Sequence, residues 1–162
     1  MKVPTAVALT LALAACATAP KPLQGQFSPL LPEAAAQGET SGELVRWGGR
    51  IVSVDPQSQR SCFEIVSAPL HSSARPRNVD HSEGRFIACR AGFYDPEVFK
   101  AGREVTISGR VEGFETRKVG EFNYRYPRVA ADVVYLWPKR RDNDYIVQPA
   151  FGIGYGWHGG WR

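Results

Sequence analysis

The sequence predicts a mainly β fold: one small domain of about five or six strands with one short helix. Its 162 residues, 43% hydrophobic and 22% charged, fit a single globular domain. Segments rich in β-branched and aromatic residues recur between residues 44 and 137, and apolar and polar side chains alternate within them. Clusters of Gly, Pro and Asp separate these segments at short intervals, as expected for strands joined by turns.

The first predicted strand covers residues 44–54 and contains two glycines, Gly48 and Gly49. Adjacent glycines in a strand predict a bulge or bend, which allows one long strand to serve two faces of a sheet. After a turn, residues 61–67 predict a second strand with Phe63 and Ile65 on one face and Cys62 on the other.

The middle of the domain combines an irregular segment with a short helix. Residues 68–84 are polar and aperiodic, so they predict the longest loop, and residues 85–90 predict a third strand. Asp95 is a suitable helix cap, Pro96 suits the first helical position and Gly102 is a stop signal. One or two helical turns are therefore expected between the third and fourth strands.

The last two strands complete the predicted topology. Residues 103–114 alternate as a fourth strand, and residues 121–137 predict a final strand that Pro127 should break or bend, at an edge. Five strands, the first strongly bent, with a helix after the third, are typical of an OB-like Greek-key β-barrel. An open β-sandwich or a six-stranded barrel fits the same signals.

The amino terminus predicts export and lipidation. After Lys2, thirteen apolar or small residues end in Leu13-Ala14-Ala15-Cys16. This run is too short to cross a hydrocarbon layer of roughly 30 Å. Its end resembles a bacterial lipobox, so residues 1–15 are interpreted as a lipoprotein signal peptide and Cys16 as the diacylglyceryl cysteine, with palmitate as the added acyl chain. The alternative is a plain secretory signal with a chance cysteine.

The segment after the lipobox predicts location and reach. By resemblance to lipoproteins of Gram-negative bacteria, Ala17 after the cysteine implies the outer membrane, with the lipid anchor on the periplasmic side. Residues 16–43, the lipidated N-terminus, are rich in Pro and Ala and are interpreted as a tether. Fully extended, the roughly 24 residues from 17 to about 40 would reach at most roughly 70 to 80 Å. Phe27, Leu30 and Leu31 could still pack back onto the domain.

Acylation of Cys16 would leave Cys62 and Cys89 as an even pair in an oxidising compartment. A disulfide between the second and third strands would close a loop of about 28 residues and stabilise the fold by roughly 3 to 4 kcal/mol. Two buried free thiols are the alternative.

Catalytic and metal motifs are weak. Asp80-His81-Ser82 contains the residue types of a hydrolase triad, but three adjacent side chains on one loop cannot converge as a triad does. The histidines His71, His81 and His158 lack the spacing of a metal site. No enzyme activity, metal or cofactor is therefore predicted.

The candidate contact surface combines the long loop with the carboxyl tail. Arg75, Asp80, His81 and Arg85 belong to the loop region, where Asp80–Arg75 or Glu83–Arg85 ion pairs are expected. Residues 139–162 are first basic and then rich in glycine and aromatics, including Trp157 and Trp161. Such a tail is either disordered or one added strand, or it is adhesive, with its aromatics at a membrane interface or stacked on sugar rings and with Lys139, Arg140 and Arg141 facing lipid phosphates.

A set of short phrases occurs in an order that resembles the Slp family of outer-membrane lipoproteins. They span residues 44–138, the expected β-barrel domain, and are Val45-Arg46-Trp47-Gly48-Gly49, Pro69-Leu70, Arg75-Pro76, Ser82-Glu83-Gly84-Arg85-Phe86, Gly92-Phe93-Tyr94-Asp95-Pro96, Gly102-Arg103-Glu104-Val105-Thr106, Val119-Gly120-Glu121 and Tyr135-Leu136-Trp137-Pro138. The resemblance implies a cell-envelope role linked to starvation and stress, without enzyme activity. Cys62 and Cys89 lie outside these phrases, so a disulfide would be specific to this branch.

Two hypotheses of function follow. The first is a non-catalytic outer-membrane lipoprotein with a structural or interaction role in the envelope, bound to lipid through Cys16 and contacting an envelope protein or glycan. The alternative is a periplasmic module that binds an oligosaccharide or peptide on a barrel face formed by Trp47, Tyr124 and Tyr126. Nucleic acid is not an expected partner, because the net charge of +4 comes from interspersed bases and acids.

Overall fold

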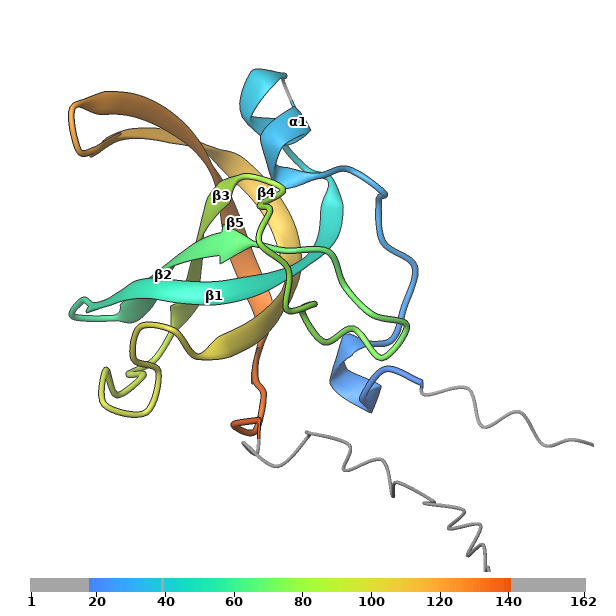
Figure 1. The fold of residues 1–162 in the computed structure, drawn as a ribbon. Coiled ribbons are helices and arrows are strands. Elements are labelled where there is room, and N and C mark those ends of the chain that lie inside the picture. Colours follow the sequence, from blue (N-terminus) through green and yellow to red (C-terminus); the bar gives the residue numbers. More distant parts are fainter. Residues whose placement is uncertain (1–17, 39, 141–162) are drawn as a thin grey trace, which may run out of the picture.

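The structure is a computed structural model that describes residues 18–38 and 40–140 (Figure 1). Its β-strands close in the order β1-β2-β3-β5-β4. All neighbours in this ring are antiparallel except β3 and β5, which are parallel. The strands are β1 (Leu44–Pro56), β2 (Arg60–Ser67), β3 (Arg85–Ala91), β4 (Glu104–Val119) and β5 (Phe122–Leu136). The mainly β, five-stranded prediction is confirmed, and the strand order is that of an OB-type ring.

Strand β1 serves two neighbours, as its glycines predict. Residues Leu44 to Arg50 pair with β4, and from Gly49 onward β1 pairs with β2. A Cβ on Gly49 would lie 1.9 Å from the backbone oxygen of Val66, so only glycine permits this approach. The irregular register falls between Ile51 and Ser53, slightly beyond the glycines.

The barrel interior is filled with side chains. Trp47 packs edge-on against Phe86, with ring centroids 5.2 Å apart. Phe63 points inward, as the alternation of β2 predicts, and meets the rings of Tyr94 and Phe99 from the loop after β3. The buried residues of this core are Ala35, Val45, Trp47, Ile51, Phe63, Ile65, Phe86, Ala88, Val105, Ile107, Val111 and Val129.

The short helix lies elsewhere than expected. Helix α1 is Pro32–Gln37, before β1, and residues 95–102, for which one or two helical turns are predicted, contain one turn and no further helix. There, the backbone N–H groups of Val98 and Phe99 donate to the oxygen of Asp95, which makes a single turn. Gly102 already donates its N–H to Ile51 of β1 at 2.8 Å, so the chain returns to the sheet before a second turn can form.

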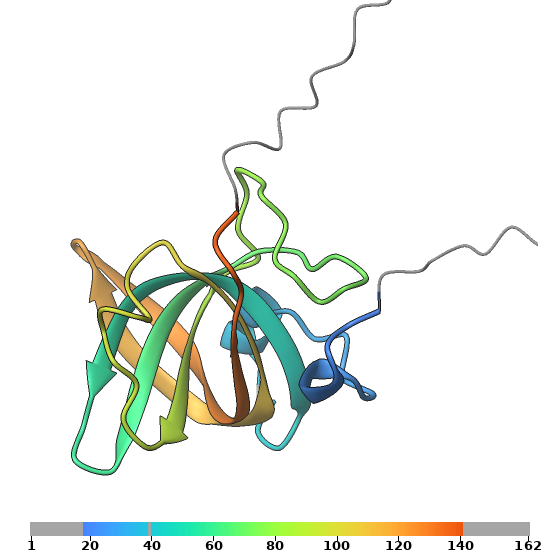
Figure 2. The same cartoon turned by 90° about the horizontal axis from the view of Figure 1, so that it is seen from below.

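The segment before β1 lies against the barrel (Figure 2). Its 3₁₀ helix η1 (Lys21–Leu23) buries Leu23 completely, and α1 buries Ala35. The indole N–H of Trp47 donates to the backbone oxygen of Leu30 at 2.6 Å. The described part of the expected tether is therefore packed onto the domain rather than extended away from it.

The β4–β5 hairpin extends beyond the barrel, and Phe122 at its tip is 68% exposed. Its distal half packs on the outer faces of β2 and β3, where Tyr124 and Tyr126 join a second apolar cluster with Ile87. Strand β5 continues through Pro127 without a break. The pairing of β5 with β3 begins only at Arg128, so the proline sits at an edge, where its missing N–H costs nothing.

Candidate functional site

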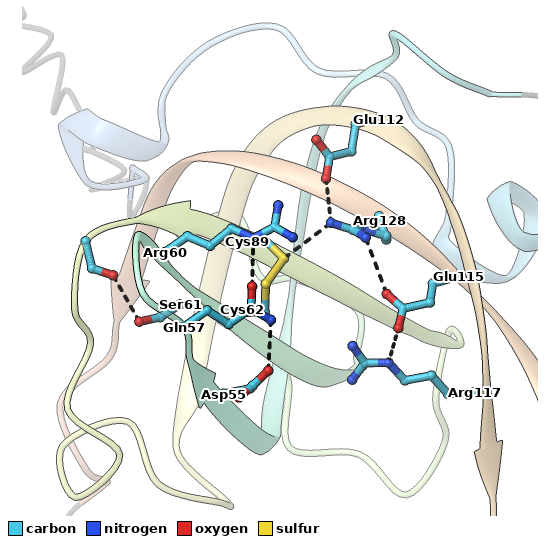
Figure 3. Close-up of a disulfide and its surroundings, with 11 residues drawn as sticks. Asp55, Gln57, Arg60, Ser61, Cys62, Cys89, Glu112, Glu115, Arg117 and Arg128 are labelled. Atoms are coloured by element: carbon cyan, nitrogen blue, oxygen red, sulfur yellow. Dashed lines mark hydrogen bonds and ion pairs between the residues drawn. A yellow bond between two sulfur atoms is a disulfide. The ribbon is translucent and has the colours of Figure 1, made fainter.

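Cys62 and Cys89 face each other on β2 and β3, and their sulfurs are bonded at 2.10 Å (Figure 3). The disulfide lies outside the barrel, in the second cluster with Ile87 and Tyr126. Both cysteines are less than a tenth exposed. The bridge therefore ties the two ends of the long 68–84 loop together at the sheet and leaves neither sulfur as a nucleophile.

A polar network next to the disulfide joins three strands. Glu64 of β2 accepts hydrogen bonds from the hydroxyl of Tyr126 at 2.8 Å and from the guanidinium of Arg85 at 2.9 Å. Burial, reinforced by the hydrogen bond to Glu64 and its negative charge, raises the pKa of Tyr126 to about 12. The network is thus a structural brace, with Tyr126 protonated at neutral pH, and Arg85 pairs with Glu64 instead of the expected Glu83.

A second set of ion pairs covers the outer side of the disulfide. Arg128 lies 3.2 Å from Glu112 and 3.5 Å from Glu115, and it donates weakly to the sulfur of Cys89 at 3.9 Å (Figure 3). Glu115 also pairs with Arg117 at 2.6 Å, and this hydrogen bond raises the pKa of the guanidinium. These ion pairs therefore join β4 and β5 within the hairpin, and the weak Arg128–Cys89 contact reaches β3.

Arg75 attaches the long loop to the end of the barrel. Its guanidinium pairs with Glu104 at 2.8 Å, donates to the backbone oxygen of Pro138 at 2.8 Å and lies 5.6 Å above the ring of Trp137. The expected pairing with Asp80 is wrong, because Glu104 at the start of β4 holds Arg75. Arg75, which is predicted as a contact residue, therefore first of all holds the long loop to the end of the barrel.

Asp80 and His81 are exposed, as a contact surface requires. His81 lines a shallow groove of about 310 Å³ beside Arg50 and Val79. Burial raises the pKa of the neighbouring Glu83, and the charge of His81 opposes this effect only partly. The Ser82 hydroxyl hydrogen-bonds to the backbone of Gly84, which is the behaviour of a polar loop.

The aromatic ligand face of the alternative hypothesis does not exist as expected. Trp47 is 4% exposed and belongs to the barrel core, whereas Tyr126 is 1% exposed and belongs to the outer cluster. The two rings lie on opposite faces of the barrel wall, and both are covered. They cannot form one platform for a sugar or peptide.

A concentration of positive charge surrounds a hollow of about 380 Å³ at the end of the barrel. We call this surface the basic pole. Its charged lining residues are Arg50, Lys100, Arg103, Glu104, Lys139 and Arg140. Glu104, the one carboxylate among them, is already paired with Arg140 at 2.9 Å and with Arg75. The pole therefore keeps a strong positive excess.

Sequence reasoning missed most of the basic pole, because its residues come from β1, the loop after β3, the start of β4 and the end of β5. Only the run Lys139-Arg140 gave a local signal. The folded chain adds Arg50 and Lys100, whose distant positions carry no common pattern.

Several predicted features lie outside the described residues. These are Cys16, the tail residues Trp157 and Trp161, and His158. Within the described ranges, no helix is both long and apolar enough to span a membrane, and no group of three or more His, Cys, Asp or Glu side chains is arranged for a metal ion.

Comparison with known proteins identifies the family. Residues 13–162 match the model of the outer membrane lipoprotein Slp family. The chain belongs to this family. The match begins within the predicted lipobox and includes the barrel, the disulfide and the basic pole.

Two relatives from Escherichia coli K12 align over most of the chain. The uncharacterized lipoprotein YeaY is 31% identical over 91% of this chain and 79% of its own length. The outer membrane protein Slp is 26% identical over 93% of this chain and 81% of its own. An uncharacterized protein of Haemophilus influenzae is 36% identical over 64% of this chain, and the match spans 56% of that protein. No solved structure matches.

Family membership makes the protein an outer membrane lipoprotein of the Slp type. The family name describes a location and an anchor, not a reaction. This name is consistent with the described residues, whose acidic and basic side chains mainly hold strands and loops together.

Proposed function

We propose that this Slp-family protein is a non-catalytic component of the cell envelope, held on the periplasmic side of the outer membrane by acylated Cys16. Its role is structural or interactive and is linked to starvation and stress. The observation that carries the proposal is the filled barrel interior in a member of an outer membrane lipoprotein family. Contact with other molecules is then left to the outer surface.

The acid–base side chains are engaged in structural hydrogen bonds and ion pairs, which supports a non-catalytic role. Glu64 and Tyr126 are bonded to each other, and Glu104 is shared by two arginines. A general base needs a free lone pair at a reacting atom, and a nucleophile needs an activating partner. Among the described residues, these buried or half-buried groups hold the fold instead.

Two exposed regions are available for an envelope protein or a glycan. One is the loop around Asp80 and His81. The other is a hollow of about 540 Å³ between α1 and the β4–β5 hairpin, lined by Arg85, Tyr124 and the exposed Phe122 among others. An aromatic edge beside a guanidinium suits peptide or sugar contacts.

Anchoring is tested by changing Cys16→Ser. The variant should remain uncleaved, lack acyl chains and leave the outer membrane fraction, as judged by mass spectrometry and membrane fractionation. Normal processing of the variant would refute lipidation at this residue. The starvation link is tested by following the amount of the protein from exponential growth into carbon starvation; a constant amount would remove it.

Partner contact is tested by photocrosslinking in intact, starved cells. A photoreactive residue replaces His81, Phe122 or Trp157, and Gln57 in the exposed β1–β2 turn is the control site. We expect one defined envelope protein or glycan at His81 or Phe122 and not at Gln57. Equal, diffuse products at all four sites would refute a specific interaction and leave a general structural role.

A further inference from the structure

We propose that the basic pole is a docking surface for anionic phospholipid head groups of the membrane that carries the anchor, so that the barrel lies on the bilayer in one orientation. This inference rests on the proposed acylation of Cys16. The basic pole adds to the lipid anchor a second contact, an electrostatic one made by the folded domain.

The pole is a built surface rather than a chance group of side chains. The segment after Ala74 runs along it and is fixed at three points: Arg75 bonds Glu104, the backbone oxygen of Pro76 accepts from Arg140 at 2.9 Å, and Asn78 accepts from Arg50. Arg103 is held by the backbone oxygens of Val98 and Trp137. The bonds of Arg50 and Arg103 are to neutral amide and carbonyl oxygens, so both guanidinium groups keep their full charge while their positions are fixed.

Positive charge exceeds negative charge on this surface. Within residues 18–38 and 40–140, no carboxylate lies within ion-pair distance of Lys100, Lys139 or Arg77. All three side chains are exposed, and Arg77 follows Pro76 along the edge of the pole. The exposed acids Asp80, Asp95 and Glu97 lie on the two loops that flank the pole and reduce the excess without cancelling it. A cluster of this kind suits lipid phosphates, which attract each nearby Lys or Arg.

The position of the anchor turns this surface toward the membrane. Ala19 packs against the cluster of Leu23, Ala74 and Trp137, and Trp137 also lines the pole. Ala19 is three positions from Cys16, and three residue steps can span at most about 11 Å. The acyl chains of Cys16 would therefore hold the Trp137 side of the domain within about one Debye length of the head groups.

The rest of the fold is consistent with this orientation. The two ends of the described chain leave the barrel on the side of the long loop, and the β4–β5 hairpin projects from the opposite side (Figures 1 and 2). Val98, 46% exposed, lies next to Arg103 and adds an apolar contact at the edge of the pole. Phe122 at the hairpin tip then faces away from the bilayer.

The test uses the full-length lipidated protein in vesicles of phosphatidylcholine, with or without about a third phosphatidylglycerol. A photoreactive residue replaces either Ala101, an uncharged residue of the pole, or Phe122 at the hairpin tip. With phosphatidylglycerol present we expect at least about fivefold more lipid adducts at Ala101 than at Phe122, and loss of this preference in high salt. Equal yields at the two sites would overturn the proposal.

A pair of charge-reversed variants separates electrostatics from anchoring. Lys100→Glu/Lys139→Glu should lower the adducts at Ala101 at least about fivefold, since each basic residue near such a surface contributes roughly a factor of five. Arg60→Glu/Lys118→Glu makes the same change in net charge away from the pole and should have no effect. Unaltered adducts in the first variant would refute the docking surface. Thermal unfolding confirms that both variants fold.

Failure of the anchor gives a different result. If mass spectrometry finds Cys16 without acyl chains, the proposed function loses its membrane attachment, and the chain is tested by flotation with the same vesicles. Flotation that requires phosphatidylglycerol, Lys100 and Lys139 would still support the basic pole. Absence of flotation would refute the pole together with the anchor.

Discussion

Reduction of the Cys62–Cys89 disulfide should destabilise the domain strongly. The two cysteines are 27 positions apart, and the chain-entropy relation for such a loop gives about 3.6 kcal/mol at 25 °C. This value depends on the length of the loop that the bond closes in the unfolded chain, and that loop includes residues 68–84 between β2 and β3.

The assay compares urea unfolding of the oxidised and the reduced protein, followed by tryptophan fluorescence. Reduction keeps both sulfur atoms in the packed cluster, so the difference reports the covalent link rather than lost volume. With an m-value of about 2 kcal/mol/M, the midpoint should fall by roughly 1.5 to 2 M. The variant Cys62→Ala/Cys89→Ala is the control and should not respond to the reductant.

Two results would refute this reasoning. A difference below about 1 kcal/mol between the oxidised and reduced proteins would mean that residual contacts, such as those of the β2–β3 ladder, already restrict the loop in the unfolded chain. Alkylation of both cysteines in the unreduced, denatured protein would show that the bond is not made at all.

Three further perturbations test separate parts of the fold. Gly49→Ala should cost at least about 3 kcal/mol in chemical unfolding, because its Cβ would meet the Val66 oxygen at 1.9 Å, whereas Gly38→Ala, with ordinary contacts, should be nearly neutral. Stability should fall as pH rises from 10 toward 12, since unfolded tyrosine loses its proton near 10 and Tyr126 near 12; Tyr126→Phe should remove roughly 1 to 3 kcal/mol of that fall, and parallel pH curves for both proteins would contradict the assignment. Arg75→Ala should cost about 1 to 2 kcal/mol and increase amide exchange in residues 72–80, while unchanged exchange there would show that Arg75 does not hold the loop.

The strands were predictable because they depend on local pattern. Alternation placed Phe63 and Ile65 inside the barrel, and Gly48 and Gly49 marked the region where β1 changes partners. The misplaced helix shows the limit of such signals. A cap, a proline and a stop glycine at residues 95–102 describe one turn as well as a helix, and the bond from Gly102 to Ile51 decides between them.

The ion pairs and the basic pole could not be predicted from local sequence pattern. Arg85 has Glu83 two residues away, but Glu83 lies in the loop before β3, whereas Glu64 on the neighbouring strand β2 lies 2.9 Å from the Arg85 guanidinium. The same reason explains the partner of Arg75, which is Glu104 at the start of β4. Pairing across a barrel depends on strand order, and the sequence does not show which strands become neighbours.

The packing of residues 18–38 changes what the protein can reach. If residues 17 to about 40 were an extended tether, they would place the barrel up to roughly 80 Å from the membrane. Since Leu23 and Ala35 are buried against the barrel and Trp47 bonds Leu30, only the few residues between Cys16 and Ala19 are left as a spacer. With Cys16 acylated as proposed, the domain stays at the bilayer surface. A partner must then come to the membrane, where the hairpin tip with its exposed Phe122 projects from the side of the barrel opposite the two ends of the described chain.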